Sequence, residues 1–217
     1  MITRPRLLAG EEFPPGPKQK RSLENRQRLK KAALDLFGEK GFERTSVDEI
    51  AKRANLAIGG FYLHYRSKKQ LLLALMDDLL EKLNHLSLAT GLGSNMQKSL
   101  RFLLDRAFSI DLQFLGACRA WEEAVLSDEE LLGKHREMRA WTNQRLATLF
   151  RIMEEQPGAR KDVDTPTLAK MIDDLFWSLL AQAVRMRRLE VERWLDSATH
   201  LIYHALFEDQ PESADEC

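Results

Sequence analysis

Cysteine and long apolar runs are both scarce in this sequence. Only two of its 217 residues are cysteine, Cys118 and Cys217, and they lie far apart. A disulfide framework is therefore not expected, which fits a reducing compartment. The sequence has no run of about 18 or more apolar residues that would span a membrane, and residues 1–21 lack the apolar segment of a signal peptide. These absences predict a soluble, cytoplasmic protein.

The short motifs of common catalytic and metal sites are also missing. The chain has no HExxH pair, no glycine-rich phosphate loop and no CxxC pair, and its Gly91-x-Gly93 turn lacks the rest of a nucleotide-binding pattern. His200 and His204 have a spacing that can bind metal, but no third ligand lies near them in sequence. Surface positions or dimer contacts explain such a pair more simply. We therefore expect no enzyme, no metal site and no cofactor.

Strand patterns are absent, and helical patterns take their place. No segment alternates between apolar and polar residues for long enough to predict a strand. Apolar residues instead recur every three or four positions, which is the spacing of one helix face. The first such stripe consists of Leu29, Ala32, Ala33, Leu36 and Phe37. The predicted fold class is all-α.

The formal charge of zero is a cancellation between unlike parts of the chain. Residues 18–69 carry 14 Lys and Arg against 6 Asp and Glu, whereas residues 70–217 carry 17 against 25. A strongly basic segment beside an acidic remainder is typical of a protein in which one small module contacts a polyanion. The alternative is that these cations only solvate a helical surface, and charge alone leaves both interpretations open.

Three short helices are predicted in the basic segment, which is the arrangement of a helix-turn-helix. Thr45 is predicted to be the N-cap of the second helix. The third helix is predicted from about residue 57 to about residue 65. Ser67 and Gln70 then have the spacing of a capping box that opens a long fourth helix. Further helices follow, one of them with Ser127 as its predicted N-cap.

The stretch GGFYLHYRSKKQL places two adjacent glycines, Gly59 and Gly60, inside the third helix. A glycine within a helix costs about 1 kcal/mol relative to alanine, so two together need a compensating reason. A helix face without side chains can lie close to the wall of a DNA groove. Three apolar residues of this helix are predicted to face the core of the module: Ile58, Phe61 and Tyr65.

The opposite face of the third helix and its flanks are predicted to contact duplex DNA. A phenol or an imidazole N–H there can donate to phosphate oxygens. The start of the fourth helix adds an ammonium group and free backbone N–H groups, which suit a phosphate. The predicted DNA-binding residues are Thr45, Ser46, Gly59, Gly60, Tyr62, Leu63, His64 and Lys68.

Residues 26–73 resemble the DNA-binding domain of the tetracycline-repressor (TetR) family. The order ALDLFGEKGFERTSVDEIAKRANLAIGGFYLHYRSKKQL carries the family pattern at Ala33, Phe37, Gly41, Thr45, Ile50, Ala51, Ala54, Gly59, Tyr62, His64, Tyr65, Lys68 and Leu71. The resemblance implies an N-terminal helix-turn-helix domain, a C-terminal helical domain that binds a ligand and dimerises, and repression of transcription.

Three positions depart from the family pattern. Ala57 stands where a serine or threonine N-cap is usual, Ile58 where a basic residue is common, and Gly60 where a hydroxyl side chain often contacts a base. We therefore expect few direct side-chain contacts to bases. Recognition would depend more on phosphates, backbone and DNA shape.

The second part of the chain holds all four tryptophans and most of the methionines. Such side chains adapt to irregular shapes and can line an apolar ligand pocket, although they can equally form an ordinary core. Glu122 lies on an apolar stripe and is the best polar candidate to orient a ligand; an internal ion pair or a solvated edge is the alternative. The predicted ligand-binding residues are Phe102, Phe108, Phe114, Cys118, Trp121, Glu122, Trp141, Phe176 and Trp177.

Two late segments carry apolar stripes broader than one core face requires. With the family resemblance, they predict a homodimer in which two helices from each subunit form a four-helix interface. The predicted interface residues are Leu175, Leu179, Ala183, Trp194, Ala198, Leu201, Ile202 and Ala205.

The sequence thus predicts a flexible N-terminal arm at residues 1–21, a helix-turn-helix domain at 22–68, a ligand-binding and dimerisation domain at 69–208 and an acidic tail at 209–217. The predicted protein is a homodimeric repressor. A small, largely apolar effector would release it from a near-palindromic operator. The alternative is a helical interaction or small-molecule-binding protein without sequence-specific DNA binding.

Overall fold

The computed structural model describes residues 3–15, 20–86, 93, 95–183 and 186–208. In these ranges the regular secondary structure is helical, apart from one isolated β-bridge between Ala159 and Phe207. The all-α prediction is therefore confirmed. The described helices include none with the length and apolar character needed to cross a membrane. The predicted acidic tail lies outside the described residues.

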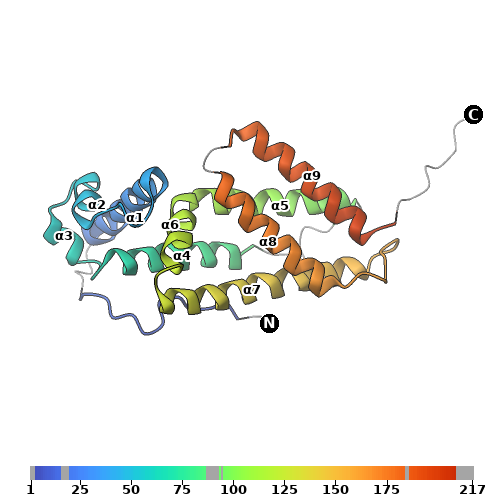
Figure 1. The fold of residues 1–217 in the computed structure, drawn as a ribbon, viewed down its shortest axis with the longest axis horizontal. Coiled ribbons are helices and arrows are strands. Elements are labelled where there is room, and N and C mark those ends of the chain that lie inside the picture. The colour runs from blue at the N-terminus through green and yellow to red at the C-terminus, as the bar shows by residue number, and fades with distance from the viewer. Residues whose placement is uncertain (1–2, 16–19, 87–92, 94, 184–185, 209–217) are drawn as a thin grey trace, which may run out of the picture.

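The helices form two groups that share α4 (Figure 1). The small group contains α1 (Lys20–Lys40), α2 (Val47–Arg53) and α3 (Ile58–Tyr62), and α4 (Lys68–Asn84) leads away from it. The larger group contains α5 (Met96–Gln113), α6 (Leu115–Val125), α7 (Glu129–Glu154), α8 (Thr165–Ala183) and α9 (Arg188–Leu206). Figure 1 shows α3 at one end of the molecule and the end of α9 at the other.

Two clusters of buried side chains hold these helices together. The first cluster includes the fully buried rings of Phe37, Phe61, Tyr65 and Trp121, so it joins α1 and α3 to α6. The second cluster lies between α5, α7, α8 and α9. Because the first cluster crosses the predicted domain boundary at residue 68, the small group and the larger group share a core.

Helix α6 packs closely against α1 and so joins the two groups. A Cβ atom on Gly116 would lie 2.0 Å from the carbonyl oxygen of Leu34, so only glycine fits at this position. Arg119 Nη1 donates to the carbonyl oxygen of Gly38 over 2.7 Å. Glu123 Oε2 accepts from the backbone N–H of Phe42, also over 2.7 Å. Helix α6 therefore holds both the last turn of α1 and the loop that follows it.

The described part of the N-terminal arm packs along α4 and reaches α7. Leu7 is fully buried, and its backbone N–H donates to Asp77 Oδ1 over 3.2 Å. Lys134 Nζ donates to the carbonyl oxygen of Leu7, and Arg4 pairs with Asp77 over 2.7 Å. Further along, Phe13 meets the edge of Tyr65. The prediction of a flexible arm did not anticipate these contacts, because they depend on partners distant in sequence.

Two predicted N-caps are wrong by one residue. Ser46, not Thr45, caps α2, and it accepts from the backbone N–H of Glu49. Asp128, not Ser127, caps α7. In both cases two capping residues stand side by side, and the local backbone conformation selects the second.

Gly116→Ala tests the contact between α1 and α6. We expect it to lower the free energy of unfolding by about 1–3 kcal/mol, because the added methyl group must separate two packed helices. Gly133 in α7 is the matched control, since a Cβ there meets nothing within 4 Å. Gly133→Ala should raise the free energy of unfolding by about 0.4–1 kcal/mol. Urea unfolding followed by circular dichroism measures both; equal effects would contradict the close approach.

Candidate functional site

Helix α3 is presented at the surface by a tight turn after α2. Asn55 in this turn has φ +55°, a left-handed conformation that asparagine tolerates. The backbone N–H of Leu56 donates to the carbonyl oxygen of Ala51 over 2.9 Å and closes the turn. Ala57 occupies the N-cap of α3 without a side-chain hydrogen bond. The Ala57 side chain therefore offers no hydrogen-bond acceptor to the first backbone N–H groups of α3.

The two faces of α3 differ as predicted, except at Ile58. Phe61 and Tyr65 are fully buried, which confirms their predicted direction. Ile58 was predicted to be buried, but 47% of it is exposed. It is the first residue of the helix, and Leu56 packs against the first cluster instead. A substituted Cβ at Gly59 would meet nothing within 4 Å.

The outer surface of α3 is therefore apolar, and around its two glycines no side chain projects from the backbone. Its exposed residues are Ile58, Gly59, Tyr62 and Leu63. Gly60 is half-buried, and a Cβ there would lie 3.4 Å from Leu56 Cβ, an ordinary contact. Neither glycine is required by packing within this chain.

His64 lies mostly inside the molecule, unlike its predicted place beside the exposed face. Only 7% of it is exposed. Burial lowers the pKa of its imidazole, and the positive charge of Arg26 lowers it further. The ring is therefore neutral at pH 7 and brings no positive charge to a phosphate.

Lys68 holds the loop between α1 and α2. Its Nζ donates to the carbonyl oxygens of Phe42 over 2.8 Å, of Thr45 over 3.2 Å and of Glu43 over 3.3 Å. The same ammonium lies 4.3 Å from the centre of the Phe42 ring. Its donors are thus already used, which differs from the predicted phosphate contact.

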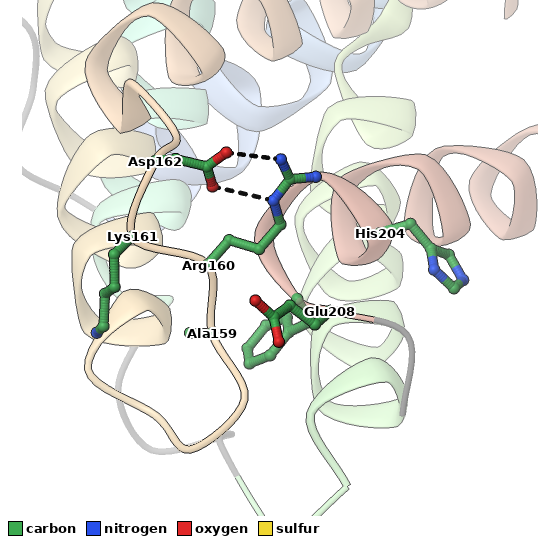
Figure 2. A pocket seen from close by; sticks show the side chains of 7 residues that line it. Ala159, Arg160, Lys161, Asp162, His204 and Glu208 are labelled. Carbon is green, nitrogen blue, oxygen red and sulfur yellow. Dashed lines mark hydrogen bonds and ion pairs between the residues drawn. The ribbon is translucent and has the colours of Figure 1, made fainter. Parts of the chain in front are cut away.

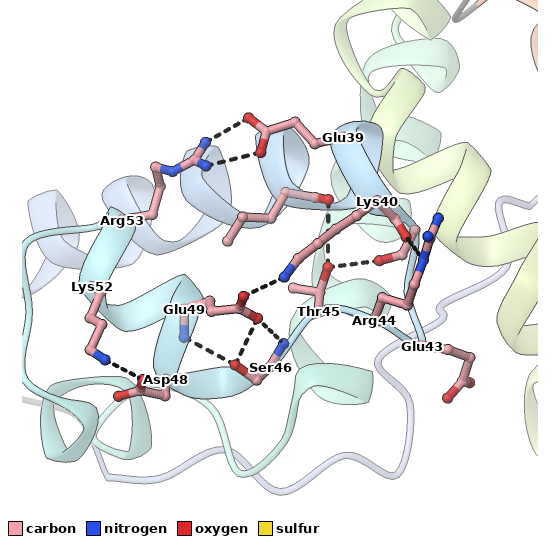
Figure 3. A network of polar contacts seen from close by, with 12 residues as sticks. Glu39, Lys40, Glu43, Arg44, Thr45, Ser46, Asp48, Glu49, Lys52 and Arg53 are labelled. Atoms are coloured by element: carbon pink, nitrogen blue, oxygen red, sulfur yellow. Dashed lines mark hydrogen bonds and ion pairs between the residues drawn. The ribbon is translucent and has the colours of Figure 1, made fainter.

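The side chains of Thr45 and Ser46 are also used within the fold (Figure 3). Thr45 is buried, and its hydroxyl donates to the carbonyl oxygen of Gly41 over 2.7 Å. Ser46 forms a reciprocal capping box with Glu49. Hydrogen bonds from Lys40 and from Ser46 lower the pKa of Glu49 to about 2. Both hydroxyls thus have partners within the fold, and their contact with DNA stays a prediction.

Several cations of the basic segment are already paired with carboxylates. Arg53 pairs with Glu39 over 2.8 Å, and Lys52 pairs with Asp48 over 2.7 Å (Figure 3). Lys40 pairs with Glu49 in the same network. The pairs of Arg53 and Lys40 join α2 to α1, whereas the pair of Lys52 lies within α2.

Other exposed cations of the basic segment have no carboxylate partner in the described part of the chain, and sequence reasoning did not single them out. Arg28 is exposed, and its Nη2 donates to the carbonyl oxygen of Asn55 in the turn before α3. Arg21 is exposed seven residues earlier, on the same face of α1. Arg44 is exposed in the loop before α2. The basic composition of the segment was the only signal for them.

A cavity of about 130 Å³ lies between α4, α5, α7 and α8. Its apolar lining includes Leu83, Leu86, Leu104, Phe108, Trp141 and Phe176. Three of these were predicted to bind a ligand: Phe108, Trp141 and Phe176. Some of the predicted ligand-binding residues therefore line one cavity, and the others do not.

The other predicted ligand-binding residues lie elsewhere. Phe102 is 53% exposed on the outside of α5. Trp121 is fully buried in the first cluster, where its Nε1 and His135 Nδ1 are 3.0 Å apart. The remaining ones do not line the cavity: Phe114, Cys118, Glu122 and Trp177. Helix periodicity identified apolar faces but not which face bordered the cavity.

Charged groups also line the cavity, and sequence reasoning missed them. Asp173 pairs with Arg139 over 2.6 Å. Arg145 Nη2 donates to the carbonyl oxygens of Leu83 and Leu86 over 3.0 and 2.8 Å. Asp111 is a further charged residue that lines the cavity. A carboxylate on an apolar stripe was a usable signal for Asp111, which follows Leu104 and Phe108 on one face of α5.

The predicted dimer interface divides into buried and exposed residues. Four of its members belong to the protomer's own core and are not available to a partner: Leu179, Ala183, Ala198 and Ile202. Leu175 and Leu201 are exposed, and Trp194 and Ala205 are partly exposed. The broad stripes on these helices therefore combine a core face with an outer apolar face.

A second hollow, of about 530 Å³, lies at the end of α9 (Figure 2), far from α3 (Figure 1). Arg160 and Asp162 on its rim pair over 2.9 Å. Arg160 lies in the loop between α7 and α8. Its backbone N–H donates to the carbonyl oxygen of Leu206, which links this loop to the end of α9. We interpret this hollow as a consequence of the hydrogen bond between the loop and α9.

The small group of helices, with its turn before α3, defines a helix-turn-helix protein. Residues 29–75 match the family described as bacterial regulatory proteins, tetR family. The match covers most of the helix-turn-helix and the first part of α4.

Curated relatives match over short segments. The HTH-type transcriptional regulator YerO of Bacillus subtilis (strain 168) is 43% identical over 51 residues, which are 24% of this chain and 18% of YerO. The A-factor receptor protein of Streptomyces griseus is 34% identical over 61 residues, which are 28% of this chain and 22% of that protein. The chain thus spans about a fifth of these relatives.

Solved structures match over most of the chain. NalD, the secondary repressor of the MexAB-OprM multidrug efflux pump in Pseudomonas aeruginosa, has a TM-score of 0.65 and 21% identity, covering 88% of this chain and 100% of NalD. The SmeT–triclosan complex has a TM-score of 0.64 and 20% identity, covering 89% of this chain and 98% of SmeT. At these identities the likeness shows the fold alone.

Lys68→Met distinguishes a loop clamp from a phosphate contact. We expect it to lower the free energy of unfolding by about 1–3 kcal/mol, since three carbonyl oxygens lose a charged donor. Arg28→Met is the matched control; it should change the free energy of unfolding by less than about 0.5 kcal/mol and reduce the salt dependence of DNA binding by about one unit of slope for each protomer. Thermal melting and DNA titration measure both. If Lys68→Met reduces the slope without affecting stability, the ammonium contacts phosphate directly.

Proposed function

We propose that the protein is a homodimeric, ligand-responsive repressor of transcription that binds duplex DNA through α3. The observation that carries the proposal is the exposed face of α3 around Gly59, where no side chain projects from the backbone, with Arg28 beside the turn that precedes this helix. Such a face allows close approach to a groove, while Arg28 reaches a phosphate. The match of residues 29–75 to the tetR family supports it.

The exposed apolar faces of α8 and α9 support dimerisation. Met171 and Leu175 lie four residues apart on α8 and are exposed. Leu201 on α9 is 54% exposed. A twofold dimer through these faces would bury them, and it would present two copies of α3 to the same DNA. If their spacing is about 34–36 Å, they fit successive major grooves of a near-palindromic site.

The cavity supports control by a small molecule. It borders the C-terminal half of α4 at Leu83 and at Leu86, just beyond it. The same helix begins at Lys68, which holds the loop before α2. An occupant that prefers one position of α4 would bias the helix-turn-helix, and a coupling of about 1–3 kcal/mol changes DNA affinity about 5- to 150-fold.

The salt dependence of DNA binding tests the proposal. We expect the logarithm of the affinity to fall with the logarithm of salt concentration with a slope of about −5 to −9, because a dimer contacts several phosphates. Fluorescence anisotropy on genomic fragments, with random duplex as the reference, measures this slope. A monomer without affinity for any duplex at low salt would refute DNA binding and leave only a small-molecule-binding protein.

Gly59→Ala tests whether the bare face of α3 approaches DNA. We expect it to raise the free energy of unfolding by about 0.4–1 kcal/mol, since the space around Gly59 is open. It should nevertheless weaken operator binding, because the methyl group separates the backbone from the groove. Gly133→Ala is the matched control, with a similar gain in stability and unchanged DNA affinity. Unchanged operator binding by Gly59→Ala would place the DNA contact elsewhere.

A further inference from the structure

One acidic side chain of the cavity between α4, α5, α7 and α8 has no hydrogen-bonding or ion-pair partner among the described residues. Asp173 is paired with Arg139, and Arg145 is held by two carbonyl oxygens at the end of α4. Asp111 on α5 forms no side-chain hydrogen bond or ion pair with any described residue, although it lines the same cavity. The cavity therefore contains one carboxyl group without a counter-charge.

A second group in the cavity lacks a partner as well. Trp141 is 3% exposed, and its Nε1 is buried without an acceptor among the described residues. A buried N–H without an acceptor is costly, so such groups usually meet water or a ligand. The ring of Trp141 is covered by Arg145, whose guanidinium lies 4.9 Å from its centre. Asp111 and Trp141 together define one acceptor and one donor at an apolar cavity.

We propose that the effector is a small apolar molecule that carries a protonated amine, and that Asp111 binds this amine. The inference rests on the proposed function, because it takes this cavity to be the effector site. The rings of Phe108 and Phe176 would contact the apolar part of the molecule. An oxygen acceptor on the molecule would satisfy the N–H of Trp141.

The size and charge of the cavity restrict the molecule. Its volume of about 130 Å³ is close to the roughly 150 Å³ of an apolar cavity that binds benzene, so a single ring fits. An anion would meet two carboxyl groups, Asp111 and Asp173. A neutral molecule would leave the charge of Asp111 uncompensated whenever that group is ionised.

Binding of the amine should be coupled to loss of a proton from Asp111. Burial raises the pKa of Asp111 to about 8, and the nearby charge of Asp173 contributes. The other ionisable groups that face it are Arg145 from α7 and the thiol of Cys118 from α6, whose pKa is raised by burial. At pH 7 Asp111 is mostly protonated, so the affinity for a cation should rise with pH up to about 8.

The experiment is isothermal titration of the full-length protein with para-methoxybenzylamine, a one-ring cation with an ether oxygen. Its neutral analogue para-methylanisole and its anionic analogue para-methoxybenzoate are the reference probes. The test variant is Asp111→Asn, which keeps the shape and removes the charge. Asp105→Asn is the matched control, because Asp105 lies on the same helix outside the cavity and pairs with Arg101.

We expect the amine to bind the wild type and Asp105→Asn alike, and Asp111→Asn about 10- to 100-fold more weakly. The affinity of the wild type should rise between about pH 6 and pH 8, a readout that needs no variant. Equal or tighter binding of either reference probe would overturn the proposal. So would unchanged affinity in Asp111→Asn, or no binding of the amine at millimolar concentration.

DNA binding separates this proposal from the proposed function. Without any amine, the wild type and Asp111→Asn should bind operator fragments equally in a mobility-shift assay. Added amine should release the wild type but not Asp111→Asn. Loss of DNA binding by the wild type would refute the repressor function, whereas intact DNA binding without amine binding would refute only the effector class.

Discussion

The contact between α6 and the end of α1 is the constraint on which the rest of the structure depends. Gly116 allows the two backbones to approach, and Arg119 and Glu123 bind the last turn of α1 and the loop after it. Glu123 also packs against Gly41: a Cβ atom on Gly41 would lie only 2.1 Å from Glu123 Oε1. The helix-turn-helix is therefore positioned by the larger group of helices and not by a flexible linker.

Helix α3 has few contacts of its own, so its presentation depends on groups around it. Phe61 and Tyr65 fix its inner face in the first cluster. Lys68 fixes the loop before α2, and the pair of Arg53 with Glu39 fixes α2 on α1. The donors of Lys68 and Arg53 that are used in this way are less available to a phosphate. The chain thus separates the charges that build the module from those, such as Arg28, that are exposed beside α3.

Helix periodicity predicted the all-α fold, the helix-turn-helix and the buried rings of α3, because these follow from local spacing. It could not predict that the donors of Lys68 bind backbone carbonyl oxygens, since backbone targets leave no trace in the side-chain pattern. It also assigned Leu179 and Ile202 to a dimer surface. A broad apolar stripe does not reveal which half is covered within the protomer. Asp111 was missed for the same reason: which polar residue borders a cavity is decided by packing between distant helices.

Helix α4 is tied at both ends to regions with different tasks. At its first residue Lys68 binds the loop before α2, and at its last turn Arg145 binds carbonyl oxygens of Leu83 and Leu86. Its 17 residues form a rod of about 25 Å. A rod held at two points transmits a displacement at one end to the other instead of absorbing it. Arg145 and both leucines line the cavity, so a displacement of these residues would reach the loop that sets the position of the helix-turn-helix.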